Sequence, residues 1–268
     1  MGRALIGGLL RSGTRPEHLS VGEPVAAARE ALARDLGITA GADNAAAVRG
    51  AAVVVLAVKP QEAAAVLGAL AGQWGAQGPL LISVAAGLRV ATLQAWCGPG
   101  VAVVRAMPNR PALVGAAATG LFAPPGVAAP QRAIAEQILG SVGEVVWVPT
   151  EAALDVVTAL SGSGPAYFFL LAQLLAEAAA ELGLEAAAAR RLAAATLHGA
   201  GLLAHCADPD LEHAQRRRGH LPGRHDRGGA ARVRGRGPAR HRGARARSRG
   251  AARARAGRRA ARPDPNRR

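Results

Sequence analysis

Three short, mainly apolar runs, Ala52–Val58, Leu80–Val84 and Val101–Arg105, most constrain what this chain can fold into. Each run is only five to seven residues long, which suits a strand better than a helix. Such runs are typical of strands that are buried on both faces of a parallel sheet. Segments with helical spacing of apolar residues separate the runs, at Gln61–Leu70 and Val90–Trp96. This alternation predicts an open α/β sheet with right-handed crossover connections.

Further short elements are expected in the rest of the first 150 residues. Helices are predicted where apolar side chains recur every three or four residues, and Gly37 suits the end of one because glycine accepts positive φ. The additional expected helices are Gly2–Ser12, Val25–Leu36, Ala45–Val48 and Gln131–Leu139. The additional expected strand-like pieces are His18–Val21, Pro111–Gly115, Gly120–Phe122 and Glu144–Val148.

The composition changes at Glu151. From there to Cys206 the residues Ala, Leu and Glu dominate, and a small-residue turn at Ser161–Pro165 precedes a long helical segment. Pro165 fits the first turn of that helix, where its missing N–H costs nothing. Two long apolar helices in this region would bury their faces against each other or against a second copy of the chain.

The net charge of +15 originates in the C-terminal tail. Residues 1–215 carry 13 basic and 16 acidic side chains, whereas residues 216–268 carry 20 Arg and 2 Asp. The tail has too few large apolar residues to form a core, and we expect it to be disordered. The rest of the chain has the slightly acidic composition of an ordinary globular protein.

The sequence contains no signal for a metal site, a disulfide framework or export. The two cysteines, Cys97 and Cys206, have neither metal-ligand nor disulfide spacing. No uninterrupted apolar run reaches the roughly 18 residues of a membrane span, and no signal peptide is recognisable after Met1. We therefore expect a cytoplasmic protein with no metal ion and no membrane partner.

Five short motifs lie where strands or helices begin or end. Lys59, the only lysine, follows an expected buried strand at the carboxyl edge of the sheet, where ligands bind in open α/β folds. At Gly87 another strand stops among small residues, which lets a flat ring approach the backbone. Taken singly, each motif is also compatible with an ordinary turn or helix start. The five are Met1–Leu5, Val53–Gln61, Ser83–Gly87, Arg105–Pro111 and Leu160–Tyr167.

In this order and spacing the motifs closely resemble the pyrroline-5-carboxylate reductases, from Gly2 to about Arg218. The resemblance implies a Rossmann-like NAD(P)-binding domain in residues 1–149, with its first strand missing. It implies an incomplete all-helical dimerisation and substrate domain in residues 150–218. The implied reaction is hydride transfer from a reduced nicotinamide to the C=N carbon of 1-pyrroline-5-carboxylate, which gives L-proline.

The resemblance also implies roles for single positions. Met1–Leu5 matches the end of a Gly-x-Gly-x-x-Gly motif, whose helix N-terminus receives a pyrophosphate. A protonated imine is already electrophilic, so we expect positioning and no dedicated catalytic acid or base. The implied cofactor-binding residues are Gly2 (pyrophosphate), Asn44 (adenosine ribose), Ala57, Val58, Lys59 and Pro60 (beside the cofactor), and Ala85, Ala86 and Gly87 (nicotinamide). The implied substrate-side residues are Glu151, Ser161, Gly162, Ser163 and Gly164.

The resemblance further implies NADPH as the cofactor, with NADH as an alternative, and a homodimer or higher homo-oligomer. Glu23 bears on the choice of cofactor because it follows the expected strand His18–Val21. An acidic residue there ordinarily binds ribose hydroxyls and repels a 2′-phosphate. Arg29 could offset that charge.

At Arg218 the chain departs from the family pattern. A Val-Thr-Ser-Pro-Gly-Gly-Thr-Thr loop that contacts the substrate carboxylate across the dimer is expected next, but residues 219–229 are GHLPGRHDRGG. Deleting one base from a GC-rich reverse translation of these residues restores that loop. We interpret residues 219–268 as out-of-frame sequence and expect the chain as it stands to have little activity and poor solubility.

Three other functions remain open at this point. A β-hydroxyacid-type dehydrogenase would share the fold, but such enzymes use a lysine on a helix of the second domain, and residues 151–215 contain none. A nucleic-acid-binding protein would use the Arg-rich tail and bind DNA with a steep salt dependence. A non-enzymatic dimer module would associate through its helical half without binding a nicotinamide.

Overall fold

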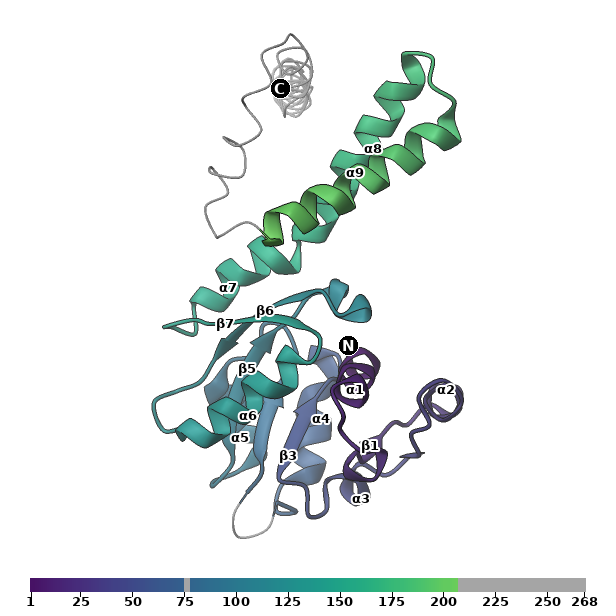
Figure 1. The fold of residues 1–268 in the computed structure, drawn as a ribbon. Coiled ribbons are helices and arrows are strands. Elements are labelled where there is room, and N and C mark those ends of the chain that lie inside the picture. The colour runs from purple at the N-terminus through teal and green to yellow at the C-terminus, as the bar shows by residue number, and fades with distance from the viewer. Residues whose placement is uncertain (75–77, 207–268) are drawn as a thin grey trace, which may run out of the picture. The chain divides into compact units, whose positions relative to one another are not determined.

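A five-stranded sheet forms the centre of the first 150 residues. The computed structural model describes residues 1–74 and 78–206 (Figure 1). The strand order is β3-β4-β5-β6-β7, and every neighbouring pair is parallel except the antiparallel pair of β5 and β6. The strands are β3 (Val53–Leu56), β4 (Leu80–Ser83), β5 (Ala102–Met107), β6 (Ala117–Phe122) and β7 (Gly143–Trp147).

A second, two-stranded parallel sheet precedes it, made by β1 (Val21–Gly22) and β2 (Ala40–Gly41). Within the described residues β1 pairs only with β2 and β3 pairs only with β4, so each has one unpaired edge. The expected strand at His18–Val21 starts only at Val21, because Pro16–His18 forms the 3₁₀ turn η1.

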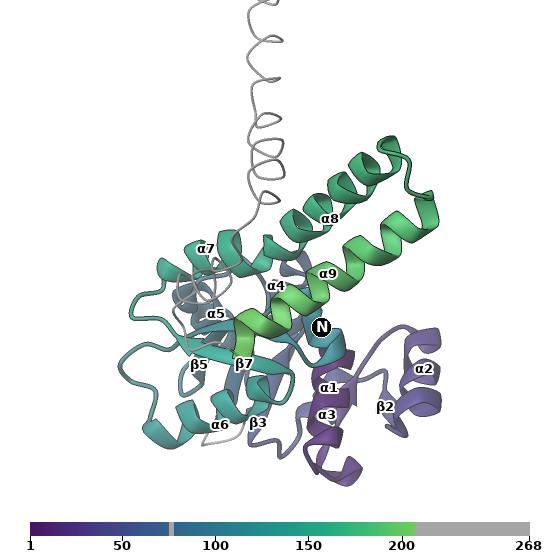
Figure 2. The same ribbon diagram turned by 45° about the horizontal axis from the view of Figure 1, so that its top comes forward.

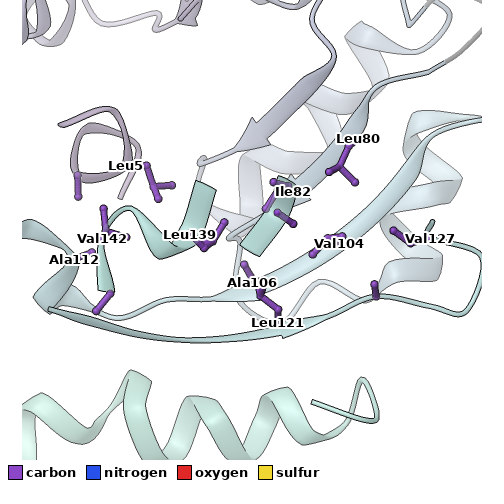
Figure 3. Close-up of a cluster of buried hydrophobic side chains, with 14 residues drawn as sticks. Leu5, Leu80, Ile82, Val104, Ala106, Ala112, Leu121, Val127, Leu139 and Val142 are labelled. Atoms are coloured by element: carbon purple, nitrogen blue, oxygen red, sulfur yellow. The ribbon is translucent and has the colours of Figure 1, made fainter. Parts of the chain in front are cut away.

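Helices cover both faces of the large sheet. The side chains of β4 alternate between two buried clusters, as the two-residue period of a strand requires. Leu80 and Ile82 pack with residues of α1 and α6, and Leu81 packs with residues of α4 and α5 (Figures 1 and 3). The helices of this half are α1 (Gly2–Arg11), α2 (Ala26–Leu36), α3 (Asn44–Val48), α4 (Pro60–Leu70), α5 (Val90–Cys97) and α6 (Ala129–Gly140).

Burial of the strands partly differs from expectation. All four residues of β4 are buried, as we expected for a strand covered on both faces. In β3 only Leu56 is buried and Val53–Val55 are half-buried, because β3 lies at the end of the sheet and has a single neighbour.

The expected strand-like piece at Pro111–Gly115 is wrong. Those residues form the 3₁₀ helix η2 (Arg110–Val114), in which Pro111 occupies the first turn and Gly115 ends the helix at φ +74°. Proline has no N–H for a sheet, and its fixed φ suits a helical first turn equally well. The two-residue strand β2 was not expected, since so short an element leaves no periodic signal.

The remaining described chain is helical. A π-helical turn η3 (Thr158–Gly162) links α7 (Ala153–Val157) to α8 (Gly164–Glu181), with Pro165 in the first turn of α8 as expected. Gly183, at φ +99°, lies in the turn that connects α8 to α9 (Ala186–Cys206) (Figure 2).

Helix α8 carries a large exposed apolar surface. Its exposed residues Tyr167, Phe168, Phe169, Leu170, Leu171, Leu174 and Leu175 are between 41% and 62% accessible. The helical stretch Ala153–Glu181, with a mean hydropathy of 1.3, is long and apolar enough to cross a membrane. The stretch includes polar residues such as Asp155 and Gln173, so it does not contradict the expectation that no uninterrupted apolar run reaches about 18 residues. One such helix is weak evidence for a membrane, and an apolar surface of this kind also suits a protein interface.

Candidate functional site

The ends of β3 and β4 lie together at one edge of the sheet. Leu56 pairs with Ser83 in a parallel register, and the N–H of Val84 donates to the carbonyl of Leu56 at 3.1 Å. The segments that leave these strands, 57–60 and 85–87, therefore start from the same edge. We expected Lys59 and Gly87 to share an edge, and the strand pairing confirms it.

The N-terminus of α1 lies beside the end of β3. A Cβ atom added at Gly2 would be 3.4 Å from the Cβ atom of Ala57. Within the described chain no side chain caps this helix. The N–H groups of a first helical turn have no partner inside the helix and attract anions. This terminus can therefore receive a phosphate group at the edge where β3 ends.

Asn44 lies against the end of β1. It begins α3, which Asp43 caps by accepting a hydrogen bond from the N–H of Ala45 at 2.8 Å. A Cβ atom added at Gly22 would overlap the Oδ1 atom of Asn44, so the amide side chain lies on the backbone of Gly22. This contact requires glycine at position 22.

The structure places Arg29 over the loop that follows β1. Its Nη1 atom donates to the carbonyl of Glu23 at 2.8 Å and to that of Pro24 at 2.9 Å. The Oε1 atom of Glu23 accepts from the N–H of Val25 at 2.9 Å. The Arg29 guanidinium and the Glu23 carboxylate thus both contact the backbone of this loop, at the position where Rossmann folds bind the adenosine ribose.

Glu151 joins three elements at the same sheet edge. Its Oε1 atom accepts hydrogen bonds from the N–H of Val90 at 2.6 Å and from Nη1 of Arg105 at 2.8 Å. Burial raises the pKa of the Glu151 carboxyl. The hydrogen bonds from Val90 and Arg105, together with the charges of Arg105 and Arg89, outweigh burial and hold the pKa below its usual value.

A cavity of about 120 Å³ adjoins this ion pair. It brings Gly87, the expected nicotinamide-side residue, together with Glu151, an expected substrate-side residue. Its polar lining is what a site for a charged ligand needs. The lining residues are Gly87, Arg89, Arg105, Glu151, Ala152 and Asp155.

The turn before α8 is attached to the turn after β5. Nδ2 of Asn109 donates to the carbonyl of Ser161 at 3.0 Å, and Oδ1 of Asn109 accepts from the N–H of Ala118 at 2.9 Å. A Cβ atom at Gly162 would be 2.9 Å from Cε of Met107, so the two turns pack closely. The motifs Arg105–Pro111 and Leu160–Tyr167 are therefore in direct contact.

The expected site residues separate into three groups, and their binding roles stay predictions. Gly2, Ala57–Pro60, Ala85–Gly87 and Glu151 lie at the shared edge, whereas Asn44 lies at the end of β1. The expected substrate-side residues Ser161–Gly164 lie apart from both, in the turn where η3 ends and α8 begins, which Asn109 contacts. Sequence reasoning assigned no role to Arg105 or Asn109. An arginine inside an expected buried strand was the signal that could have identified the first. Among residues 1–74 and 78–206, no group of three or more His, Cys, Asp or Glu side chains could hold a metal ion.

Two family models match the chain. The model described as pyrroline-5-carboxylate reductase dimerisation matches residues 151–219. The model described as NADP oxidoreductase coenzyme F420-dependent matches residues 1–87. The second model thus covers the segments that follow β3 and β4, and the first covers the helical half.

Named relatives and solved structures agree with these matches. The pyrroline-5-carboxylate reductase of Pseudomonas aeruginosa is 44% identical over 218 residues, which is 81% of this chain and 79% of that protein. The Haemophilus influenzae reductase is 39% identical over 200 residues, 75% of this chain and 73% of that protein. The solved pyrroline-5-carboxylate reductase from Coxiella burnetii is 34% identical, with a TM-score of 0.80 over 90% of this chain and 88% of that one. The Plasmodium falciparum pyrroline carboxylate reductase with NADP bound is 26% identical, with a TM-score of 0.69 over 84% and 81% of the two chains.

The fold and the strand-end site define an NAD(P)-dependent oxidoreductase with a Rossmann-type domain and a helical dimerisation domain. Both halves of the chain match proteins of one kind at high identity. The chain belongs to the pyrroline-5-carboxylate reductase family. This membership disfavours the three other functions that the sequence left open.

Proposed function

We propose that this protein reduces 1-pyrroline-5-carboxylate to L-proline with NADPH, the last step of proline biosynthesis. The observation that carries the proposal is the shared sheet edge, where the N-terminus of α1, the Lys59 segment and the Gly87 loop meet. The 44% identity to the P. aeruginosa reductase supports the choice of substrate.

The described residues fit NADPH at several points. The uncapped first turn of α1 would hold the pyrophosphate, and Asn44 the adenosine ribose. Gly87 has a φ of +78° and open space where a side chain would be, so a flat ring can approach its backbone. When bound, NADPH supplies the hydride for the C=N carbon.

The protein's task on the substrate side is positioning. Reduction of a protonated imine needs no strong acid, but the reacting atoms must be held about 3–3.5 Å apart. Glu151 and the turn Ser161–Gly164 are the residues that we assign to the substrate side. The shared cavity of Gly87 and Glu151 supports the assignment, because it places both sides of the reaction at one sheet edge.

We infer that residues 1–149 form the NADPH-binding domain and residues 150–218 the dimerisation and substrate domain. The exposed apolar residues of α8 support a homodimer or a larger homo-oligomer in the cytoplasm. The proposed out-of-frame segment, residues 219–268, lies outside the described residues, and its interpretation stays a sequence prediction.

The test measures NADPH consumption on addition of 1-pyrroline-5-carboxylate, for the chain as it stands and for a version with the reading frame restored after Arg218. We expect the restored version to consume NADPH and form L-proline, and the present chain to be much slower. A β-hydroxyacid with NADP serves as the control substrate. Oxidation of that control, with no reduction of the imine by either version, would overturn the proposal.

A further inference from the structure

Arg105 is a buried charge in the middle strand of the large sheet. Its side chain is 9% exposed, and its backbone pairs with Ser83 of β4 and Phe122 of β6. A guanidinium group in such a place is strongly unfavourable unless a carboxylate compensates it. Glu151 is that carboxylate, and it comes from the turn between β7 and α7, 46 residues further along the chain.

The same Glu151 oxygen also caps α5. Val90 is the first residue of that helix, and the residue before it, Arg89, makes no side-chain cap. The carboxylate of Glu151, which lies 61 residues further along the chain, therefore accepts the hydrogen bond from the Val90 N–H that a local cap would ordinarily accept. One oxygen atom thus binds together the middle strand, the start of α5 and the turn that leads into α7.

These attachments lie on the two segments that the proposed reaction must bring together. The Gly87 loop ends where α5 begins, only three residues before Val90. Helix α7 continues into η3, whose last two residues begin the Ser161–Gly164 turn, and Asn109 donates a hydrogen bond to the carbonyl of Ser161 at the start of that turn. A displacement of Glu151 would move the Gly87 loop and the start of α7 relative to each other.

We propose that Arg105 and Glu151 are positioning residues, which hold the substrate turn at Ser161–Gly164 in a set place relative to the nicotinamide loop at Gly87. The inference rests on the proposed function for the identity of those two segments. Arg105 orients the Glu151 carboxylate and neutralises its charge. Glu151 in turn fixes the Gly87 loop, through Val90, relative to the helical segment that leads to the Ser161–Gly164 turn. Arg89 and Asp155 are the other charged groups around the same cavity.

The first experiment separates positioning from cofactor binding, with the variants Glu151→Ala, Glu151→Gln and Arg105→Met in the full chain with the reading frame restored after Arg218. A misplacement of ~1 Å can reduce turnover about 100-fold, so we expect kcat/KM for the imine to fall at least about tenfold in Glu151→Ala and Arg105→Met. The affinity for NADPH should change less than about threefold, since these residues make none of the proposed cofactor contacts. Glu151→Gln keeps an acceptor for the Val90 N–H and should recover part of the loss.

Arg34→Ala is the matched control, because it also removes an arginine–carboxylate pair, but one whose arginine side chain is 70% exposed. Arg34→Ala should leave both kcat/KM for the imine and the affinity for NADPH unchanged. The double variant of Arg105 and Glu151 should be no worse than the poorer single variant, as expected for two residues that act together.

The second experiment, hydrogen exchange of the backbone amides, does not depend on turnover. Glu151→Ala should speed exchange at Val90 and across residues 158–163, Glu151→Gln should restore protection at Val90, and Arg34→Ala should change neither. Unchanged exchange at both places would overturn the inference, as would equal losses of NADPH affinity and imine turnover. A frame-restored parent that binds NADPH but never reduces the imine would instead count against the proposed function, and the exchange comparison would still decide the positioning role.

Discussion

The side-chain amide of Asn109 donates a hydrogen bond to the backbone carbonyl of Ser161 at 3.0 Å. The two residues are 52 positions apart and belong to two different motifs of the sequence, the turn after β5 and the turn before α8. Asn109 is 8% exposed, and its other side-chain atom accepts from the N–H of Ala118. A single buried amide thus ties the end of β5, the start of β6 and the proposed substrate turn together.

Replacing Asn109 should therefore destabilise the fold. Asn109→Ala leaves the N–H of Ala118 and the carbonyl of Ser161, both on half-buried residues, without their partner, and such a loss typically costs about 1–3 kcal/mol of unfolding free energy. Asn109→Asp keeps the acceptor for Ala118 but loses the donor for Ser161, and so should be intermediate. Urea unfolding measures both values. Equal stability of Asn109→Ala and the parent would contradict the prediction.

Close packing of α7 on β6 gives a second prediction. A Cβ atom at Gly120 would be 2.8 Å from both γ carbons of Val157, so Gly120→Ala must shift α7. Overpacking of this kind typically costs about 1–3 kcal/mol. Gly126 has open space around its Cβ position, and Gly126→Ala is the control that thermal unfolding should show to be nearly neutral. Equal melting temperatures of the two variants would disprove the expected contact.

The pH dependence of stability should contain a contribution from Glu151. Its pKa in the folded protein lies below the ordinary value of a glutamate carboxyl, so its stabilisation is fully present above that ordinary value and is lost as the pH falls through the folded pKa. Glu151→Gln should remove this contribution and flatten the acid limb of the stability curve. Thermal unfolding of both proteins at a series of pH values below neutrality provides the comparison. Parallel curves throughout the acid range would show that Glu151 does not titrate as described.

Cofactor choice should respond to Arg29. Its guanidinium lies over the loop after β1, where the 2′-phosphate of NADPH is expected, and a hydrogen bond to a charged group is worth about 1.5–3 kcal/mol. Arg29→Ala should therefore weaken NADPH about tenfold or more and leave NADH nearly unchanged. Glu23→Ala should act in the opposite direction on the NADPH-to-NADH ratio.

The control for the cofactor experiment is Arg34→Ala on the same helix, whose arginine contacts Asp35. Fluorescence titration of each variant with both nucleotides gives the affinities. Loss of NADPH and NADH binding to the same extent in Arg29→Ala would mean that Arg29 supports the loop and does not discriminate between the cofactors.

Association should depend on the apolar face of α8. Phe169 is 62% exposed, and burial of such a side chain in an interface is worth about 1.5–3 kcal/mol. Phe169→Ser should shift the monomer–dimer equilibrium toward the monomer, as seen by analytical ultracentrifugation over a range of concentrations. Val25→Ser, at a similarly exposed position of the first domain, should leave it unchanged. An unaltered equilibrium in Phe169→Ser would place the interface elsewhere.

Local signals in the sequence were enough to predict most helices and strands, and the sheet edge that the ends of β3 and β4 share. Gly37 ends α2 in the left-handed conformation, Pro60 opens α4, and the apolar run at Leu80–Ser83 forms a strand buried on both faces. These features depend on backbone sterics and on side-chain periodicity, which act within a few residues of each other. The common position of the ends of β3 and β4 could then be predicted, because consecutive parallel strands present their carboxyl ends at one edge of the sheet.

What the amino-acid sequence determined alone is therefore the order of elements, the carboxyl-edge site and, through its motifs, the family. Only the tertiary structure decided that β6 runs antiparallel to β5, that Pro111 opens a 3₁₀ helix, and that Glu151 and Ser161 are bound by Arg105 and Asn109. The physical reason is the range of the forces involved. A hydrogen bond between residues about fifty positions apart forms only when packing of the whole sheet has buried both partners, and no periodicity or turn residue records that event.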